Sequence, residues 1–150
     1  MDEFWSKTDH GLDAQKRLVI PKDIRPLLGE RFAVFMPVLS VSEEVPHLVV
    51  MPEDKYNNYI SRVRRHYAGQ MRDRQIRKLS VAMQMTSTDS AGRVTLSEAL
   101  RKYAGLDGKV AIVGCGKRLE LWSPEKLKED LRREVDDAHE NEGVPLDDEE

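Results

Sequence analysis

Apolar residues follow two patterns along this chain, short runs and longer periodic stretches. The short runs are rich in Val, Ile, Leu and Phe and are bounded by Gly, Pro or charged residues, which is typical of β-strands. They predict strands at LVI (18–20), RFAVFM (31–36), HLVVM (47–51), RVTL (93–96), KVAIVG (109–114) and LELW (119–122). The sequence GCGK (114–117) predicts a tight turn between the last two strands.

The longer stretches repeat their apolar residues every three or four positions, as amphipathic helices do. Two short helices are expected at PKDIRPLLG (21–29) and SEALRKYAG (97–105), each stopped by its final glycine. A longer helix is expected between them, with a basic part from Arg62 to Lys78, and a last helix begins with Ser123 as N-cap and Pro124 in the first turn. The apolar stripes of these two helices consist of Tyr56, Ile60, Val63, Tyr67 and Met71, and of Leu127, Leu131, Val135 and Ala138.

The order of these elements repeats. DAQKR (13–17) returns 76 residues later as DSAGR (89–93), and other residues match at the same offset. The connection PVLSVSEEVP (37–46) is five residues longer than its counterpart, so the offset then falls to 71 and matches Leu48 with Leu119. This agreement indicates an internal duplication. The matches at offset 76 include Ile24 with Leu100, Arg25 with Arg101, Gly29 with Gly105 and Val34 with Val110.

Each half therefore reads β-α-β-β-α, and the fold class is predicted to be α+β. The halves are placed at residues 1–72 and 73–140, followed by an acidic tail at 141–150 that is expected to be disordered. Neither half has enough apolar sequence to close a core alone. We therefore expect the strands of both halves to close one small barrel, as an intramolecular pseudo-dimer without exposed sheet edges.

Charge is distributed unevenly over the 150 residues, whose net charge is −3. Residues 124–150 have a net charge of −8, residues 1–123 of +5, and residues 62–78 of +6. A basic body permits a polyanionic partner. The basic helix either contacts phosphates or forms a solvated face or subunit interface, and we favour the second interpretation. The acidic tail either competes with DNA phosphates for the cations of the body or only solvates the chain.

Composition excludes several classes of protein. The single cysteine, Cys115, cannot form an intrachain disulfide and fits a reducing cytoplasm. No apolar run approaches the roughly 20 residues that a membrane helix needs, and the N-terminus does not resemble a secretory signal. No base accompanies Cys115, and no ligand spacing relates His10, His47, His66 and His139, so we expect no enzyme, metal or cofactor.

The repeated Asp-x-x-x-Arg loop has a physical use. An Asp side chain accepts hydrogen bonds from backbone N–H groups two residues on and so shapes a turn. An arginine presented by a firm loop can donate two parallel hydrogen bonds to guanine O6 and N7 or to a phosphate. The alternative is an Asp–Arg ion pair that only shapes the turn, and residue chemistry alone leaves both open.

The loops HGLDAQKRLVIP (10–21) and DSAGRVTL (89–96), together with LRKYAGLDGKVAIVGCGKRLELWS (100–123), resemble the MraZ family of bacterial transcriptional regulators, within the SpoVT/AbrB superfamily. The resemblance covers about residues 4–135. It implies a double swapped-hairpin AbrB barrel, a closed ring of subunits, and binding to direct repeats in the promoter ahead of the division and cell-wall gene cluster, hence a nucleoid-associated protein. It implies DNA contacts from the Asp-x-x-x-Arg loops, which carry over to Asp13 and Arg17 and to Asp89 and Arg93. Within these loops we expect Arg17, Arg93, Lys16 and Gln15 to contact DNA, with Asp13, Asp89 and Gly92 shaping the loops.

The first loop departs from the family pattern D-x-K-G-R, because Lys16 stands where a glycine is usual. If that position needs a positive φ, the lysine costs about 1 kcal/mol and adds a cation. The second loop keeps Gly92 but has Ala91 and Ser97 where Lys and Pro are usual. We therefore expect unequal contributions of the two loops to DNA binding. A second hypothesis is an antitoxin-like AbrB-fold protein whose acidic tail covers a toxin, which rests on fold analogy alone.

Overall fold

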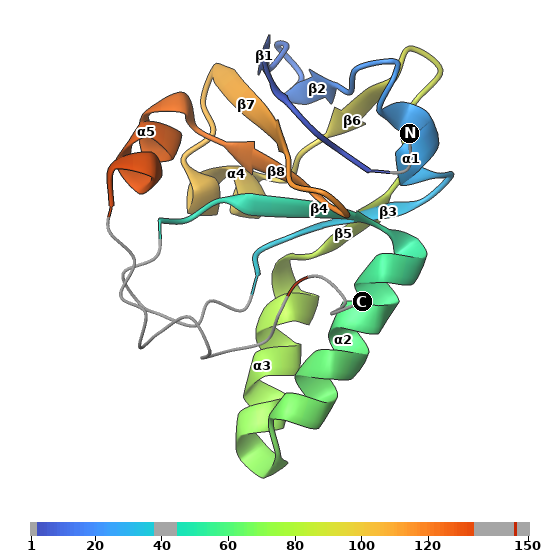
Figure 1. Ribbon diagram of the computed structural model, residues 1–150, viewed down its shortest axis with the longest axis vertical. Helices are drawn as coiled ribbons and strands as arrows, with labels where there is room; N and C mark the ends of the chain where they lie inside the picture. Colours follow the sequence, from blue (N-terminus) through green and yellow to red (C-terminus); the bar gives the residue numbers. More distant parts are fainter. Residues whose placement is uncertain (1–2, 38–44, 134–145, 147–150) are drawn as a thin grey trace.

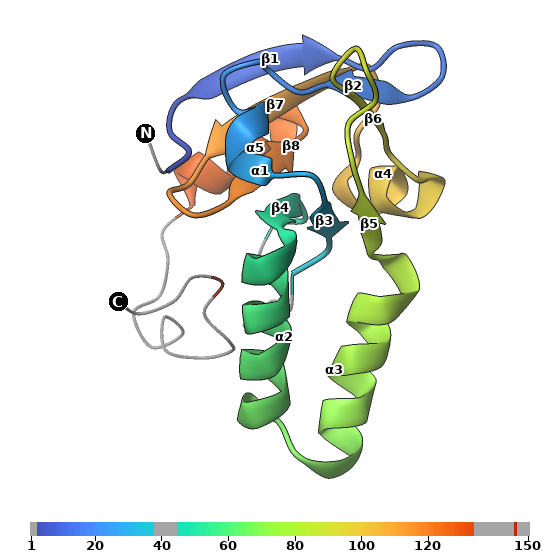
Figure 2. The ribbon, with the colours of Figure 1, turned by 90° about the vertical axis from the view of Figure 1, so that its right-hand side faces the viewer.

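The computed structural model describes residues 3–37, 45–133 and 146. These residues form an α+β protein, as predicted (Figure 1). A β-rich body lies at one end, and two helices, α2 and α3, extend from it side by side (Figure 2). The elements in chain order are β1 (Lys7–Gly11), β2 (Arg17–Val19), α1 (Arg25–Leu28), β3 (Phe32–Phe35), β4 (Leu48–Pro52), α2 (Glu53–His66), α3 (Gly69–Ala82), β5 (Gln84–Thr86), β6 (Arg93–Thr95), α4 (Glu98–Ala104), β7 (Lys109–Gly114), β8 (Leu119–Trp122) and α5 (Pro124–Arg132).

The strands form two antiparallel sheets in which both halves of the sequence alternate. The large sheet has the order β1-β7-β8-β4-β3-β5, and β2 pairs with β6 in a separate two-stranded ribbon. The pairs β1–β7, β8–β4, β5–β3 and β2–β6 each join a strand before residue 73 to a strand after it. The hydrogen-bonded core therefore needs both halves.

The strand registers follow the duplication. In the ribbon, Leu18 lies opposite Val94, its own match at offset 76. In the large sheet, Val49 lies opposite Glu120, its match at offset 71. A residue lies opposite its own counterpart only where an approximate twofold axis passes between the two paired strands. The registers thus place an approximate twofold axis through both pairs and confirm both offsets.

One predicted match is wrong. Thr8 pairs with Ile112, and its counterpart Gln84 pairs with Val34, so Val34 corresponds to Ile112 and not to Val110. The local offset is 78 because two more residues separate Gly105 from Ile112 than separate Gly29 from Val34. A glycine with a positive φ of 85°, Gly108, turns the chain in this longer connection.

The large sheet is covered on both faces, which explains why all four residues of β3 are buried. Phe32 and Val34 face a core that also contains Leu18 and Val94 of the ribbon, together with residues of α1 and α4. Ala33 and Phe35 face a second core beneath α2 and α3. Full burial of such side chains contributes about 1.5–3 kcal/mol each, so the two cores stabilise the sheet between them.

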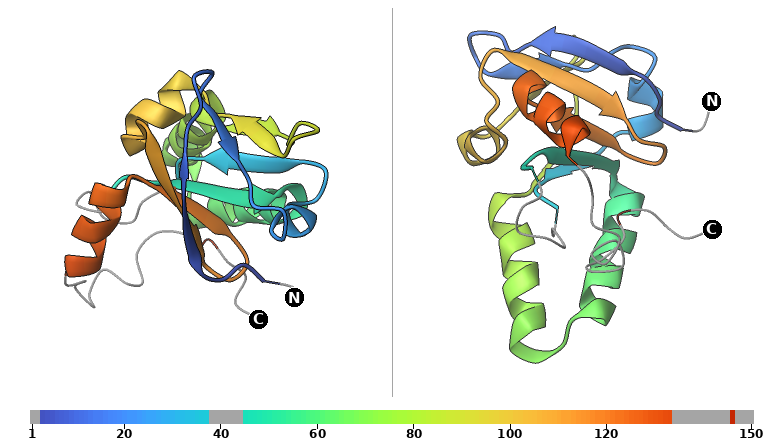
Figure 3. Two further views of the ribbon diagram at one scale, coloured as in Figure 1. Left: turned by 90° about the horizontal axis from the view of Figure 1, so that it is seen from above. Right: turned by 60° about the vertical axis from the view of Figure 1, so that its left-hand side comes forward.

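On the same outer face as α2 and α3, α5 packs over β7 and β8 (Figure 3). Ser123 caps α5 by accepting a hydrogen bond from the Lys126 backbone N–H, and Pro124 begins the helix, as predicted. Leu127 is partly buried, whereas Leu131 is exposed. The predicted stripe residues Val135 and Ala138, and the acidic tail except Leu146, lie outside the described residues.

The basic region 62–78 is not one helix, so that prediction is wrong. α2 ends at His66, Tyr67 and Ala68 are extended, and α3 begins at Gly69, whose φ is 56°. The periodic stripe continues through the break, but Met71 is 51% exposed, whereas Val63 is buried. Gly69 allows the chain to reverse, so the region forms a helical hairpin with cations on both arms.

Each half has one more strand than predicted, because β1 and β5 were missed. β1 has the sequence KTDHG, without the apolar alternation of a half-buried strand, and four of its five residues are exposed. Both strands lie at the edges of the large sheet, where backbone pairing holds them on one side only. In β5, Met85 also packs on the core beneath α2 and α3. Among the described residues, no helix has the length and apolar character to span a membrane.

Candidate nucleic-acid interface

The first Asp-x-x-x-Arg loop is held by one carboxylate. Oδ1 of Asp13 accepts hydrogen bonds from the backbone N–H groups of Gln15 and Arg17, both at 2.9 Å. Oδ2 of Asp13 accepts from Nε of Arg17 at 2.7 Å. The Asp13 carbonyl also accepts from the Lys16 N–H at 2.9 Å. The side chain of Asp13 therefore fixes both the turn and the direction of the Arg17 guanidinium.

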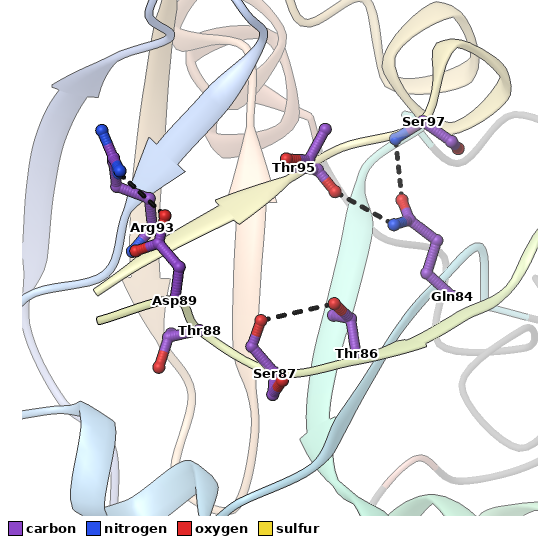
Figure 4. Close-up of a pocket in the computed structure, with 8 residues that line it drawn as sticks. All are labelled: Gln84, Thr86, Ser87, Thr88, Asp89, Arg93, Thr95 and Ser97. Carbon is purple, nitrogen blue, oxygen red and sulfur yellow. Dashed lines mark hydrogen bonds and ion pairs between the residues drawn. The ribbon is translucent and has the colours of Figure 1, made fainter. Parts of the chain in front are cut away.

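The second loop repeats this geometry (Figure 4). Oδ1 of Asp89 accepts from the N–H groups of Ala91 and Arg93 at 2.9 Å, and Oδ2 accepts from Nε of Arg93 at 2.9 Å. The Asp–Arg ion pair, which the sequence left open as an alternative, is thus present in both loops. In each loop the carboxylate accepts from Nε of the arginine. The outer edge of the guanidinium, which carries the two Nη groups, therefore points away from the carboxylate. Turn shaping and presentation of the arginine are compatible.

Both arginines stand on the same face of the β2–β6 ribbon. Arg17 lies opposite Thr95, and Arg93 opposite Val19. Because side chains alternate along a strand, these four share one face, and the buried Leu18 and Val94 occupy the other. Strand geometry places the two arginine Cα atoms roughly 8 Å apart. Each guanidinium is partly exposed, with 27% exposure for the Arg17 side chain and 34% for the Arg93 side chain.

The loop environment lowers the pKa of both carboxyl groups. The main cause for Asp13 is the backbone N–H of Arg17, helped by the Arg17 side chain and the Gln15 N–H, and partly opposed by desolvation. Asp89 has the equivalent causes from Arg93 and Ala91. Both carboxylates therefore stay ionised well below neutral pH, and the arginines keep their partners.

The third residue after each Asp adopts a left-handed conformation. Gly92 has a φ of 78°, and Lys16 has a φ of 62°. The position of Lys16 therefore does need a positive φ, and the expected backbone strain at this lysine is present. A Cβ added at Gly92 would also meet the guanidinium of Arg25, which would have to move.

Arg25 and its counterpart Arg101 match at offset 76, and the sequence pattern alone predicts no role for either of them. Nε of Arg25 donates to the Ile20 carbonyl at 2.7 Å, and Nε of Arg101 donates to the Leu96 carbonyl at 3.0 Å. Both arginines are partly buried. The repeat itself was the signal, because a cation that recurs at offset 76 beside a loop is part of the same duplicated unit.

The flank of the second loop is an open polar cavity of about 520 Å³ between residues 84–89 and β6 (Figure 4). Gln84 spans its far end, donating to the Thr95 carbonyl at 3.0 Å and accepting from the Ser97 N–H at 2.7 Å. This brace fixes β6 relative to the preceding strand. Besides Asp89 and Arg93, the cavity is lined by Gln84, Thr86, Ser87, Thr88, Thr95 and Ser97.

The remaining candidates are structural. His47 is buried and stacked on Trp122, with ring centroids 4.1 Å apart, and its Nε2 lies 3.6 Å from Oε2 of Glu120. His10 contacts the Thr8 hydroxyl at 3.2 Å, and Cys115 is partly buried in the turn before β8. His139 lies outside the described residues. Among the residues that are described, no three His, Cys, Asp or Glu side chains gather as metal ligands would.

The chain is similar in sequence to known proteins. A family model described as "MraZ protein, putative antitoxin-like" matches residues 82–141. A "Transcriptional regulator MraZ" from Dictyoglomus thermophilum is 34% identical over 125 residues, which cover 80% of this chain and 79% of that protein. The protein of that name from Carboxydothermus hydrogenoformans is 32% identical, with coverages of 81% and 82%. Another, from Lactobacillus delbrueckii subsp. bulgaricus, is 28% identical and covers 97% of both chains.

Proposed function

Because the chain belongs to the MraZ family of transcriptional regulators, we propose that it binds double-stranded DNA sequence-specifically through its two Asp-x-x-x-Arg loops. Membership in a family of regulators also agrees with the prediction that the protein is not an enzyme. The observation that carries the proposal is the presentation of Arg17 and Arg93 on one exposed face of a two-stranded ribbon, each steered by its own carboxylate.

A two-stranded antiparallel ribbon is one of the elements that fit the major groove of B-DNA. In this arrangement the end-on edges of Arg17 and Arg93 donate to guanine O6 and N7. Gln15 steers Arg17, because its Oε1 accepts from Nη2 of Arg17 at 3.3 Å. Lys16 contacts a phosphate next to the first loop, which adds affinity without sequence preference. The two loops therefore contribute unequally.

The finer parts of the proposal concern architecture and biology. The interleaved strands and the twofold registers support a double swapped-hairpin barrel made from two halves. The family resemblance supports a closed ring of subunits that binds direct repeats in its own promoter, ahead of the division and cell-wall gene cluster. Such a protein resides in the cytoplasm, associated with the nucleoid.

DNA-binding titrations with the promoter region upstream of the protein's own gene test the central proposal. Arg17→Ala and Arg93→Ala are each expected to weaken binding by roughly 1–3 kcal/mol, without a change in assembly size. Lys128→Ala, which removes an exposed cation from α5, is the matched control and should have little effect. Wild-type affinity of the Arg17→Ala/Arg93→Ala double variant at moderate salt would refute the assignment.

A second candidate function rests on the description of the matching family model, which includes "antitoxin-like". In that case the protein would neutralise a toxin, with its acidic tail as the covering segment. Sedimentation velocity of the purified protein separates the two candidates. A large closed assembly supports the ring-forming regulator, and a small dimer supports the antitoxin.

A further inference from the structure

The polar cavity beside the second loop opens on the same face of the ribbon as the two loop arginines (Figure 4). Arg93 and Thr95 line this cavity, and both belong to the exposed face of β6. The opposite wall is the segment 84–89, which runs from β5 into the loop. A ligand in the cavity would therefore lie directly beside whatever the arginines contact.

The cavity is lined by hydroxyl groups that the first half of the chain lacks. Five of its eight lining residues are Ser or Thr. None of their five counterparts at offset 76 carries a hydroxyl. The hydroxyls are therefore a property of the second half alone. The pairs are Thr86 with His10, Ser87 with Gly11, Thr88 with Leu12, Thr95 with Val19 and Ser97 with Pro21.

A shorter edge strand accounts for the cavity. In the first half, β1 continues to Gly11, and the backbone N–H of Leu12 still donates to the carbonyl of the residue before β7 at 2.7 Å. In the second half, β5 already ends at Thr86. Within the part of the chain that the structure describes, no backbone–backbone hydrogen bond holds Ser87 or Thr88. These two residues therefore leave the sheet and present their polar groups to the cavity.

Two of the other hydroxyls already have partners within the fold. The Thr86 hydroxyl donates to the Ser87 carbonyl at 3.4 Å. The Ser97 hydroxyl caps α4 by accepting from the Leu100 N–H at 3.3 Å. Ser87 is exposed and Thr88 is half-buried, so their hydroxyls are the best-placed donors on the wall opposite β6.

The charges of the cavity compensate each other. Its two charged lining residues are Asp89 and Arg93, which form an ion pair. Both carboxylate oxygens of Asp89 accept hydrogen bonds from its own loop. The cavity thus offers neutral donors beside one braced guanidinium. Pockets for small molecules are mostly apolar, whereas Ser and Thr hydroxyls are common donors to DNA phosphates.

We propose that this cavity binds a phosphate of the DNA backbone, with the hydroxyls of Ser87 and Thr88 as donors. The major groove is about 12 Å wide, and neighbouring β-strands are about 5 Å apart. A segment beside β6 therefore meets one wall of the groove while the ribbon faces the bases. The second loop holds the backbone through neutral hydroxyls, and the first loop through the charge of Lys16. This inference rests on the proposed function and specifies how the second loop is anchored.

Removal of the hydroxyls tests the site. Ser87→Ala and Thr88→Val each delete one hydroxyl without a change in charge. In titrations with the promoter region, each should reduce affinity roughly three- to tenfold. The slope of log K against log salt concentration should stay at its wild-type value, because this slope reflects the cations that neutralise phosphates. Lys16→Gly, in contrast, should reduce the slope by about one unit.

Two control variants separate a lost contact from a damaged fold. Thr88→Ser keeps the hydroxyl and should bind as wild type does. Ser61→Ala removes an exposed hydroxyl from α2, which packs on the other face of the large sheet, and should also bind as wild type does. Wild-type affinity of the Ser87→Ala/Thr88→Val double variant would overturn the proposal. A loss of affinity in Thr88→Ser as large as in Thr88→Val, or a reduced salt slope in the double variant, would overturn it as well.

A methylphosphonate placed at one linkage at a time in the promoter DNA locates the contact, because it replaces a charged phosphate oxygen with a methyl group. Wild-type protein should lose affinity at the contacted linkage. The Ser87→Ala/Thr88→Val double variant should lose much less there, because it already lacks the donors. Equal losses for both proteins at every linkage would overturn the proposal.

The arginine variants distinguish failure of this inference from failure of the proposed function. Weakened binding of Arg17→Ala and Arg93→Ala, together with wild-type binding of the double hydroxyl variant, would refute the phosphate site alone. Wild-type binding of the double arginine variant would refute DNA reading by the loops, and the phosphate site with it.

Discussion

Replacing Lys16 with glycine should raise the stability of the fold and lower its affinity for DNA. The φ of Lys16 is 62°, and a side chain in this conformation costs about 1–2 kcal/mol. Glycine removes that cost but loses about 0.5–1 kcal/mol through the greater freedom of the unfolded chain. The net gain is therefore about 0.5–1 kcal/mol, or about 1–4 °C in Tm for a chain of this size.

Scanning calorimetry or thermal circular dichroism measures the gain. Ala14→Gly is the matched control, because Ala14 is exposed in the same turn and its φ is not positive. That change should destabilise the protein by several tenths of a kcal/mol. A loss of stability in Lys16→Gly as large as that in Ala14→Gly would refute the strain argument.

The same variant tests the phosphate contact of Lys16. Loss of one phosphate contact reduces the slope of log K against log salt concentration by about one unit. Affinity should fall equally for the promoter site and for random DNA, because a phosphate contact carries no sequence information. A loss confined to the promoter site would show that Lys16 reads bases.

Three further predictions concern the carboxylates and glycines. Asp13→Asn should weaken promoter binding although it removes a negative charge, because Arg17 loses its brace; tighter binding in a titration would contradict this. Gly92→Ala should lower Tm by more than Gly69→Ala, because both positions have positive φ, but a Cβ at Gly92 would meet the guanidinium of Arg25 whereas nothing lies within 4 Å of a Cβ at Gly69. Glu120→Gln should lower the free energy of unfolding, measured with urea at neutral pH, by on the order of 3 kcal/mol. Burial alone would raise the pKa of Glu120, but the buried His47 and the partly buried Arg118 lower it to about 2. The contribution of Glu120 to stability is therefore present above pH 4.5 and is lost as the pH falls towards 2. A Glu120→Gln variant with the stability and acid sensitivity of wild type would show that this carboxylate is not held by charge.

The duplicated parts of the fold could be predicted because two copies of one pattern confirm each other. The loops were found from Asp13 and Arg17 recurring at offset 76, and the glycine stops of the short helices from Gly29 and Gly105. The strands with buried faces were found because their apolar residues are continuous. Continuous apolar runs therefore predicted the strands whose position is determined by burial of their side chains.

Features determined by backbone pairing or by a single residue were missed. β1 is polar and exposed, and its pairing partner β7 lies about a hundred residues away, so no local pattern reveals it. The break after His66 depends on the positive φ of Gly69 inside an uninterrupted apolar period. The proximity of the Arg25 guanidinium to Gly92 was missed because the two residues belong to different halves, which only the folded chain brings together.

The twofold axis through the pairs Leu18–Val94 and Val49–Glu120 has a consequence for evolution and for operator symmetry. In a dimer of identical chains, a residue on the axis faces its own copy, so a buried Glu120 would oppose a second carboxylate. Fusion into one chain removes this restriction, and the axis carries valine opposite glutamate. The same freedom let the loops diverge, with Lys16 in one and Gly92 in the other. Identical protein halves favour palindromic operators. One chain with unlike halves can instead select a site with a direction, and copies of such a site can follow one another head to tail.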